Sequence, residues 1–511
     1  MARVLIINPV VREEDVPRHI PYGEALLAAI TIKEGHQVAV YDANAWRQPL
    51  SKVADACKAD TWDVIAIGGL TTTYGFIKAA CKIAKDCAPD ALLVAGGGFL
   101  TSMPREVMQW VPEIDVGIVG EAFRTWPEVL RNHSEREWTN VQGLVWRQRG
   151  EIVLNEARPV IHDLDELPWP AWDLFPLEEV YFKNSSALFS EEIYECKRRI
   201  DINGSYGCSL ICRYCWHLGT TGDMLVEEAP GGGRDVVFTY GRNLRYHSPA
   251  YIVGMVGELK RRYNVDFVTF LDENLMTMEV SSGRKWLGQI CDEWDRAGLN
   301  PRKGAGVYWS GTSHAGLHRP DTLRRMHESG CTHLVYGLES FDPGILKRLG
   351  KGTNRDNNIS SVRICLESGI APIPNIIIGF PEETFESIRN TITALIQLGI
   401  HAKPHFATAY PGSEWYYSYK DAILEQYAGN LEAYILDLGD ATKITATISR
   451  NFTGMELLGL QEIVARRDLR LLDLAEKEWC PRTLTTPREA FNFRPKRAPG
   501  PIESIPVVIA A

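Results

Sequence analysis

The most constraining feature of the sequence is a short loop that contains three cysteines, Cys208, Cys212 and Cys215. Tyr214 stands directly before the third cysteine. Three thiolates can hold three irons of a cubane [4Fe–4S] cluster, and the fourth iron then stays open. Structural clusters and structural zinc sites usually have four protein ligands. The Cys-x3-Cys-x2-Cys spacing therefore indicates a cluster whose open iron binds a substrate or cofactor, with a structural iron–sulfur or zinc site as the alternative.

The sequence before this loop alternates short apolar strands with amphipathic helices. The expected strands are Arg3–Asn8, Gln37–Asp42, Val64–Gly68, Leu92–Gly96 and Val116–Val119, and two of the expected helices are Tyr22–Lys33 and Tyr74–Cys87. This order predicts a parallel sheet with helices on both faces. We therefore expect a Rossmann-like α/β domain over residues 1–142.

Ligands of such sheets bind beyond the carboxyl ends of the strands. Glycines there let a large ligand approach the backbone, and threonines at a helix start offer hydroxyl and amide groups. The residues at these strand ends are Asn8, Pro9, Thr71, Thr72, Thr73, Gly96, Gly97, Gly98, Gly120 and Glu121. No G-x-G-x-x-G motif follows the first strand, so a dinucleotide is not expected. A flavodoxin-like domain with ordinary turns and no ligand is the alternative.

The sequence after residue 196 predicts six further strands, each followed by a helical segment. These strands are expected near Ile200–Ser205, Phe267–Leu271, Gly304–Ser310, His333–Leu338, Pro374–Gly379 and His405–Tyr410. Six such units favour a partial (β/α)6 barrel of the TIM type over residues 196–415. Functional groups of barrels lie at the carboxyl ends of the strands, and the cysteine loop follows the first of these strands.

The cysteine loop and the later strand ends resemble the radical S-adenosylmethionine (SAM) superfamily. The run Gly337-Leu338-Glu339-Ser340 with a downstream Lys351-Gly352-Thr353 is common in that superfamily. The resemblance implies that the three cysteines bind a [4Fe–4S] cluster and that SAM chelates its open iron. It also implies contacts with SAM for Asp272, Glu273, Ser310, Glu339, Ile377 and Gly379.

The first domain resembles the cobalamin-binding domain that precedes many radical SAM modules. The segments Pro21–Ala28, which includes Tyr22 and Gly23, and Gly120–Ala122 match its pattern. The resemblance implies that these two residues and the strand-end residues named above contact cobalamin. The Asp-x-His-x-x-Gly signature of a cobalt-binding histidine is absent, and His19 has the wrong spacing. We therefore expect cobalamin with its tail detached and no histidine on cobalt.

Three other segments connect or flank these domains. The linker 143–195 is expected to hold a small hairpin, Leu144–Arg147 with Glu151–Leu154, and then an extended tether, because Pro168, Pro170 and Pro176 disfavour a helix. The insertion 216–248 is long enough to be either a substrate-facing lid or a surface insertion. The C-terminal region 416–511 is expected to be mainly helical, with one helix near Met455–Leu474.

The composition limits the partners and the compartment. A net charge of −10 disfavours nucleic-acid binding. No apolar run reaches the roughly 18 residues of a membrane span. The 11 cysteines are odd in number and scattered, which is untypical of a secreted disulfide scaffold and indicates a reducing cytoplasm.

The resemblance implies a class B radical SAM methyltransferase, which transfers a methyl group from SAM through methylcobalamin to an unactivated carbon. It also implies an external low-potential electron donor such as ferredoxin or flavodoxin. Substrates in the resembling group include peptides and small molecules, and we expect a peptide or protein side chain, for example the glutamine of methyl-coenzyme M reductase, with a small molecule as the alternative. A cobalamin-dependent radical SAM cyclase or rearrangement enzyme for a tetrapyrrole is the alternative, and a non-enzymatic iron–sulfur or zinc protein is a further one. The sequence indicates no particular catalytic residue.

Overall fold

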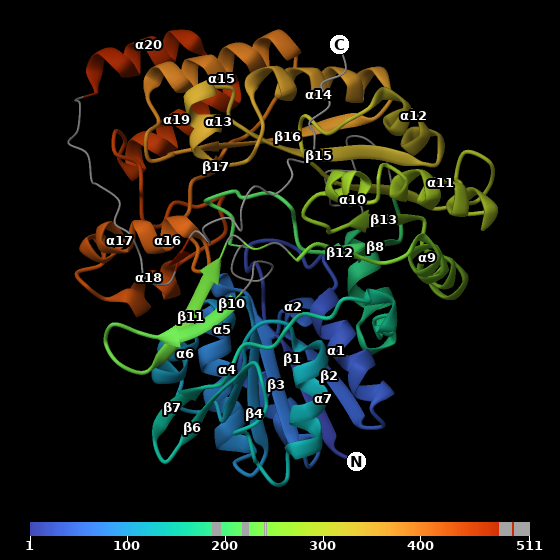
Figure 1. The fold of residues 1–511 in the computed structure, drawn as a ribbon, viewed down its shortest axis with the longest axis vertical. Coiled ribbons are helices and arrows are strands. Elements are labelled where there is room, and N and C mark those ends of the chain that lie inside the picture. Colours follow the sequence, from blue (N-terminus) through green and yellow to red (C-terminus); the bar gives the residue numbers. More distant parts are fainter. Residues whose placement is uncertain (186–195, 217–223, 240, 242, 480–492, 495–511) are drawn as a thin grey trace.

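The computed structural model describes residues 1–185, 196–216, 224–239, 241, 243–479 and 493–494 (Figure 1). The end of the expected linker, part of the insertion and most of the chain after residue 479 lie outside the described residues. Two largely parallel sheets form the centres of two lobes, and helices surround both. The first sheet lies in the lower lobe of Figure 1, and the second lies in the upper lobe.

The first sheet has seven strands in the order β2-β1-β3-β4-β5-β6-β7. They are β1 (Arg3–Asn8), β2 (Gln37–Asp42), β3 (Val64–Gly69), β4 (Leu92–Gly97), β5 (Val116–Ile118), β6 (Leu144–Gln148) and β7 (Glu151–Leu154). The first five strands are parallel, and the order changes direction between β1 and β3, where such sheets open a crevice for a ligand. The last two form the expected hairpin, which pairs antiparallel with β5 and so extends this sheet beyond residue 142.

Helices cover both faces of the first sheet. They are α1 (Tyr22–Lys33), α2 (Ala43–Trp46), α3 (Ser51–Lys58), α4 (Tyr74–Cys87), α5 (Gly98–Ser102), α6 (Pro104–Trp110) and α7 (Ala122–Asn132). In β1 the residues Val4 and Ile6 join the core on the α1 side, and Leu5 and Ile7 join the core on the α4 side. Burial on both faces explains why this strand is apolar without alternation.

The second sheet is a curved half-barrel of six parallel strands in the order β17-β16-β15-β14-β13-β8. They are β8 (Arg199–Ile202), β13 (Phe267–Phe270), β14 (Tyr308–Ser313), β15 (Cys331–Glu339), β16 (Ala371–Ile378) and β17 (His405–Phe406). The helices around it are α9 (Pro249–Tyr263), α10 (Leu275–Ser281), α11 (Trp286–Arg296), α12 (Pro320–Glu328), α13 (Pro343–Arg348), α14 (Arg355–Glu367) and α15 (Phe385–Leu398). The expected α/β architecture, a Rossmann-like domain followed by a partial barrel, is confirmed.

The strands of the half-barrel separate apolar from polar side chains. Ile200, Ile202 and Phe270 belong to the core that the helices share. On the alternate positions Arg199 pairs with Asp201, and the Nε of Arg199 donates a hydrogen bond to Thr269 Oγ1 at 2.8 Å. The inner face of this sheet is therefore polar and charged, as in a barrel that binds a ligand rather than one filled by apolar side chains.

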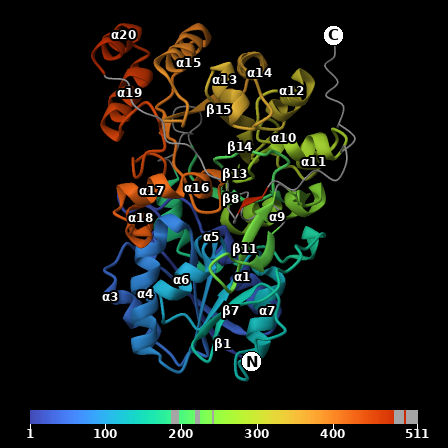
Figure 2. The same cartoon turned by 60° about the vertical axis from the view of Figure 1, so that its left-hand side comes forward.

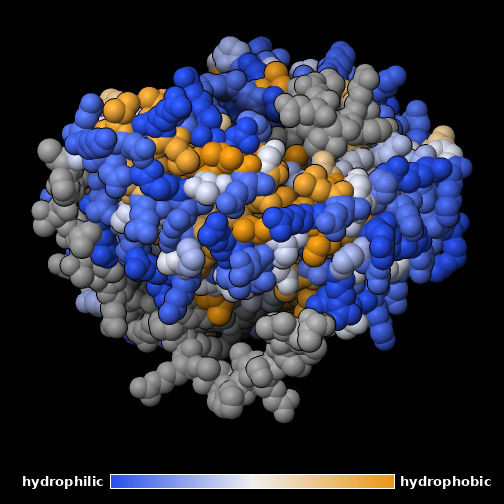
Figure 3. Space-filling view, turned by 90° about the horizontal axis from the view of Figure 1, so that it is seen from above, coloured by the Kyte–Doolittle hydropathy of each residue, from blue (hydrophilic) through white to orange (hydrophobic). Residues whose placement is uncertain are grey.

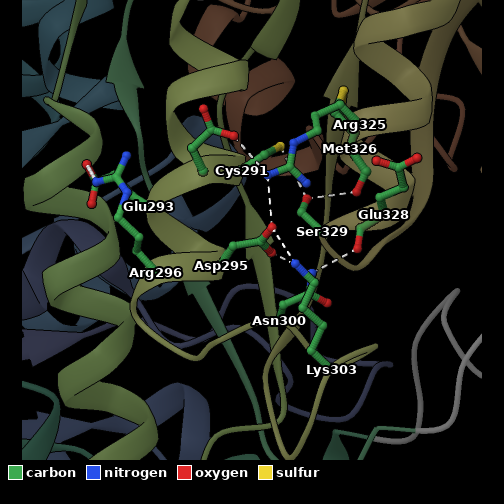
Figure 4. Close-up of polar contacts among 11 residues, drawn as sticks. Cys291, Glu293, Asp295, Arg296, Asn300, Lys303, Arg325, Met326, Glu328 and Ser329 are labelled. Atoms are coloured by element: carbon green, nitrogen blue, oxygen red, sulfur yellow. Dashed lines mark hydrogen bonds and ion pairs between the residues drawn. The ribbon is translucent and has the colours of Figure 1, made fainter.

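The helices outside the barrel are tied together by ion pairs. Asp295 of α11 accepts hydrogen bonds from Lys303 Nζ at 2.9 Å and Arg325 Nη2 at 3.0 Å (Figure 4).

The space-filling view in Figure 3 shows the molecule from the top of Figure 1, where apolar residues interrupt a hydrophilic surface. No helix in the described part of the chain is long and apolar enough to span a membrane.

The C-terminal region is helical, as expected, and the helical segment predicted near Met455–Leu474 is divided into two helices. Its described helices are α16 (Glu414–Ser418), α17 (Lys420–Gln426), α18 (Leu431–Asp437), α19 (Gly454–Arg466) and α20 (Leu469–Glu478). The chain breaks at Arg467, which has a φ of +55°, and the Asp468 side chain then caps the next helix. Of these helices, α18 lies beside α4 of the lower lobe, and α20 packs on α15 of the upper lobe, while α19 contacts β16 and α20.

The tether and the insertion both pack against other parts of the chain. The tether forms no α-helix among its described residues and has only short turns, with Trp172 buried and Tyr181 Oη donating to Asp42 at 2.6 Å. The insertion forms a hairpin of β10 (Met224–Glu228) and β11 (Arg234–Thr239), and β11 also pairs with β18 (Phe493–Arg494). This hairpin lies over α6 and β7 (Figure 2).

A separate pair of short strands, β9 (Ser205–Tyr206) and β12 (Arg245–Tyr246), lies beside the cysteine loop.

Candidate active site

The cysteine loop begins where β9 ends, at the carboxyl end of the first barrel strand. Gly207 starts it with a φ of +96°, and a Cβ on this residue would lie 2.7 Å from the carbonyl oxygen of Asn243. Only glycine fits this turn without displacing the neighbouring strand. Cys212 is buried, and Cys208 and Cys215 are partly buried.

The donor set of this loop fits a three-cysteine cluster better than a zinc ion. Nowhere in the described part of the chain do three His, Cys, Asp or Glu side chains come close enough to bind one metal ion. A tetrahedral zinc site needs such a group, whereas the thiolates of a cubane cluster bind different irons. Burial raises the pKa of Cys212 to about 12. Cys196 is the nearest other cysteine in sequence, and its Sγ donates a hydrogen bond to the carbonyl oxygen of Ser185 at 3.4 Å, outside the cysteine loop.

A buried charged pair supports the loop from the end of β15. Lys351 Nζ contacts the carboxylate of Glu339 and the carbonyl oxygen of Gly337. Tyr214, inside the cysteine loop, donates its hydroxyl hydrogen to the same carboxylate at 2.7 Å. Burial lowers the pKa of Lys351, but Glu339 and the nearby Cys212 and Cys208 together outweigh this effect, so the pKa is raised above its ordinary value and the side chain is charged.

One cavity of about 450 Å³ lies between the two lobes. Loops at the carboxyl ends of β1, β3 and β4 form one side of it, and the cysteine loop and the ends of β15, β16 and β17 form the other. Its wall contains Val11, Arg12, Leu70, Thr71, Thr72, Gly98, Tyr214, Cys215, Trp216, Glu339, Asn375, Ile377, His405, Phe406, Ala407, Thr408, Tyr410, Trp415, Asp440, Ala441 and Thr442. The strand ends of both sheets therefore face a common space.

Six of the residues that the sequence suggested line this cavity. From the first lobe they are Thr71, Thr72 and Gly98, and from the second they are Cys215, Glu339 and Ile377. The Trp216 ring bridges the two lobes, because a Cβ on Gly98 would lie 3.1 Å from it. The cysteine loop therefore touches the strand end where cobalamin is expected.

The other residues suggested for SAM do not line the cavity. Asp272 accepts hydrogen bonds from Gly204 N at 2.9 Å and from the hydroxyl of Ser205, and burial still raises its pKa to about 7. Burial also raises the pKa of Glu273 to about 7. The Ser310 hydroxyl lies 3.4 Å from Thr269 Oγ1.

Gly379, also suggested for SAM, has its amide bound by the carboxylate of Glu383. A Cβ on Gly379 would lie 2.9 Å from the Leu457 side chain of α19. Helix α19 thus closes over the end of β16, where SAM is expected.

Several residues suggested for cobalamin have structural partners of their own. Asn8 Nδ2 donates to Asp42 at 2.7 Å, and Gly120 N donates to Thr101 Oγ1 at 3.0 Å. Glu121 forms a bidentate ion pair with Arg245 of the insertion, and the side chains of both are largely buried.

The remaining cobalamin candidates lie in the same strand-end region without lining the cavity wall. Thr73 Oγ1 donates to Leu70 O at 2.8 Å, and Tyr22 is buried. Gly97 packs against the backbone of Gly69, which approaches Pro9. Gly96 pairs with Gly68 between β3 and β4, and Gly23 lies in the first turn of α1.

The rim of the first sheet is the side of the cavity where cobalamin is expected. This side of the cavity offers the apolar Leu70, of which 41% is exposed, together with small and hydroxyl side chains. Among the described residues that line the cavity, the one histidine is His405, which comes from β17 of the other lobe. His19 is directed elsewhere, since its Nδ1 lies 2.6 Å from Asp201 Oδ2.

The sequence did not single out the residues at the mouth of the cavity. Arg12 Nε pairs with Asp440 Oδ2 at 2.8 Å, which joins a loop of the first lobe to the segment after α18. His405 is partly buried beside them, and burial lowers its pKa. Neither Arg12 nor Asp440 belongs to a sequence motif, and only the fold brings them together. Trp216, in contrast, directly follows Cys215, so its place in the sequence could have identified it as a site residue.

Two family models match the chain. One, described as the radical SAM superfamily, matches residues 202–395, and the other, described as the B12 binding domain, matches residues 10–130. The first match includes the cysteine loop and most of the half-barrel. The second begins just after β1 and covers the parallel strands β2, β3, β4 and β5 of the first sheet.

Curated relatives and a solved structure agree with these matches. The uncharacterized methyltransferase PH0819 of Pyrococcus horikoshii is 26% identical over 407 residues, 79% of each chain. The anaerobic magnesium-protoporphyrin IX monomethyl ester cyclase of Cereibacter sphaeroides is 24% identical, over 66% of this chain and 50% of the cyclase. The radical SAM methyltransferase TsrM of Kitasatospora setae, solved with cobalamin and a [4Fe–4S] cluster, has a similar fold. Its TM-score is 0.63 at 16% identity, over 83% of this chain and 78% of TsrM.

Proposed function

The chain belongs to the cobalamin-binding radical SAM family, whose cofactors are a [4Fe–4S] cluster, SAM and cobalamin, and we propose that it transfers a methyl group from SAM through cobalamin to an unactivated carbon. The observation that carries this proposal is the single cavity where Cys215 of the cysteine loop faces Leu70 and Thr72 of the first sheet. A methyl group that passes from one cofactor to an acceptor needs both within reach of the same space.

The proposal assigns a task to each group of residues. Cys208, Cys212 and Cys215 hold the cluster, and the strand-end rim from Leu70 to Thr72 together with Gly98 holds cobalamin. When bound, the cluster and SAM supply the radical chemistry, and cobalamin supplies the methyl group. The protein orients these groups and keeps water away from them.

Residues of the second lobe position SAM and enclose the acceptor. Glu339 presents a carboxylate that Lys351 and Tyr214 hold in place, and Ile377 adds an apolar contact. Aromatic side chains, Trp216 and Trp415 among them, cover the wall between the lobes and limit the entry of water.

For the acceptor, we propose an organic molecule that enters between Arg12 and Asp440, where both a cation and an anion can bind polar groups. A peptide side chain, such as the glutamine of methyl-coenzyme M reductase, fits this description. The specific observation that favours the alternative, ring closure of a tetrapyrrole, is the match to the magnesium-protoporphyrin cyclase.

Mass spectrometry with SAM that carries a deuterated methyl group tests the proposal. The anaerobically reconstituted protein is incubated with a reductant and candidate acceptors, and 5′-deoxyadenosine is measured in parallel. Deuterated methyl in the product, absent when Cys212 is replaced by alanine and retained in Cys87→Ala, supports methyl transfer. Product without the label supports the cyclase alternative and contradicts methyl transfer. Cys87 is a partly buried cysteine in α4 and serves as the matched control.

A further inference from the structure

The cysteine loop has an inner and an outer face. Cys212 and Tyr214 are turned into the protein, and the residues between and before them, Ile211 and Arg213, are exposed. Ile211 is 40% exposed, and the side chain of Arg213 is 51% exposed. Part of the cysteine loop therefore lies directly on the molecular surface.

The outer face of the loop adjoins the end of α13. Arg213 N donates a hydrogen bond to the carbonyl oxygen of Leu349 at 3.0 Å. A Cβ on Gly350 would lie 2.5 Å from the carbonyl oxygen of Ile211, so this residue has to be a glycine for the two segments to lie so close. Arg348, just before this contact, lines the same shallow pocket as Arg213, and the preceding residue Lys347 is exposed as well.

This surface, which we define as the loop patch, consists of Ile211, Arg213, Lys347 and Arg348. Its acidic neighbours hold the arginines only loosely, because Arg213 and Glu414 are 3.7 Å apart and Arg348 and Glu382 are 3.9 Å apart. Such exposed pairs contribute little stability and can exchange partners. The loop patch therefore presents one apolar and three cationic side chains on a chain whose net charge is −10.

We propose that the loop patch is the docking site of a small acidic one-electron carrier protein. This inference rests on the proposed function, because it requires a cluster at the three cysteines. Long-range attraction between opposite charges speeds the encounter, and a small apolar contact lets the carrier leave again, as redox complexes require. One electron leaves the carrier, which is oxidised by one electron, and the cluster is reduced by one electron, with no bond formed or broken.

The rate of cluster reduction by reduced flavodoxin, an acidic carrier, tests the proposal. The reconstituted full chain is compared with Arg348→Glu and Arg213→Glu by stopped-flow absorbance and electron paramagnetic resonance, at low and high salt. Photoreduction by the small uncharged 5-deazariboflavin serves as a second reductant that needs no docking site. Arg296→Glu is the matched control, because Arg296 is exposed on α11, where it pairs with Glu293 outside the barrel (Figure 4).

We expect each loop-patch variant to slow reduction by flavodoxin at least tenfold at low salt, and the difference to shrink as salt screens the charges. Reduction by 5-deazariboflavin and reduction of Arg296→Glu should keep the wild-type rates. An unchanged flavodoxin rate in Arg348→Glu overturns the docking site, and so does an equal slowing with both reductants. Failure of the wild-type protein to bind iron and sulfide is a different outcome, which contradicts the cluster itself and hence the proposed function.

Discussion

The ammonium group of Lys351 contacts the carboxylate of Glu339 in a pair whose side chains are only 7% and 6% exposed. Glu339 has a φ of +61°, which is unfavourable for a residue with a side chain. The same carboxylate also accepts the hydrogen bond from Tyr214 of the cysteine loop. The pair therefore fixes a strained strand end at the boundary between the cysteine loop and the cavity.

Loss of Lys351 should be costly. Lys351→Met leaves the Glu339 carboxylate buried without its cation, although the Tyr214 hydroxyl still donates to it, and unpaired buried charges of this kind destabilise by about 3–5 kcal/mol. Chemical unfolding of the apoprotein measures the change. Glu339→Gln combined with Lys351→Met should recover part of the loss, because no charge then remains.

Lys303→Met is the control for this experiment. Lys303 Nζ pairs with Asp295 at 2.9 Å, but its side chain is 67% exposed, so we expect a change of at most about 1 kcal/mol. Equal effects of the two lysine variants would contradict the importance of the buried pair.

Tyr214→Phe should weaken SAM binding without loss of iron. It removes the 2.7 Å hydrogen bond to Glu339 and keeps the ring, so the carboxylate is less well positioned. We expect the Kd for SAM to rise about tenfold, the equivalent of about 1.4 kcal/mol. Equilibrium dialysis and iron analysis of the reconstituted protein provide both values.

Tyr251→Phe is the matched control, because its hydroxyl lies 3.2 Å from the carbonyl oxygens of Leu167 and Pro168 in the tether. Wild-type SAM affinity in Tyr214→Phe, or a loss of iron in that variant, would show that Tyr214 does not act through Glu339.

Much of the fold could be predicted from local patterns. In the first sheet, β1 and β2 have the predicted bounds, because their apolar runs end at turn residues such as Asn8-Pro9. The helix break at Arg467 could not be predicted, because leucines on both sides continue the apolar stripe. The hairpin Leu144–Leu154 was recognised, but pairing with β5 depends on tertiary contacts that the local pattern does not contain.

Only part of the candidate site could be predicted from the sequence. The cysteines and Glu339 belong to motifs with fixed spacing, and Thr71 and Thr72 follow a recognisable strand. Asp272 is an example of what spacing cannot decide, since its oxygens are bound by Gly204 and Ser205 rather than directed into the cavity.

Glu383 should make the protein less stable as the pH rises from about 4.5 to 8. Burial raises the pKa of this carboxyl to about 8 from its ordinary value near 4.5. The folded state therefore binds more protons than the unfolded state in this range, so stability falls with rising pH and levels off above 8. Thermal unfolding at several pH values measures this slope, and Glu383→Gln should flatten it. An equally steep slope in the variant would assign the pH dependence to other groups.

The ion pair between Arg12 and Asp440 should control access to the cavity more than it controls stability. The Arg12 side chain is 52% exposed, so the pair adds at most about 1 kcal/mol. Asp440→Asn should therefore leave the unfolding midpoint nearly unchanged and raise the rate at which bound cobalamin exchanges with labelled cobalamin. Asp321→Asn, which alters an exposed ion pair on α12, is the control. Equal exchange rates in the two variants would contradict a gating role.

The central claim is that the strand ends of the first sheet hold cobalamin in the same cavity that the cysteine loop borders. The most direct test is the cobalamin and iron content of Thr72→Trp, which fills the cavity from the first lobe, with Thr61→Trp on the exposed surface as the control. We predict that Thr72→Trp binds cobalamin at least tenfold more weakly and retains its iron, while the control retains both. Normal cobalamin binding by Thr72→Trp would contradict the shared cavity.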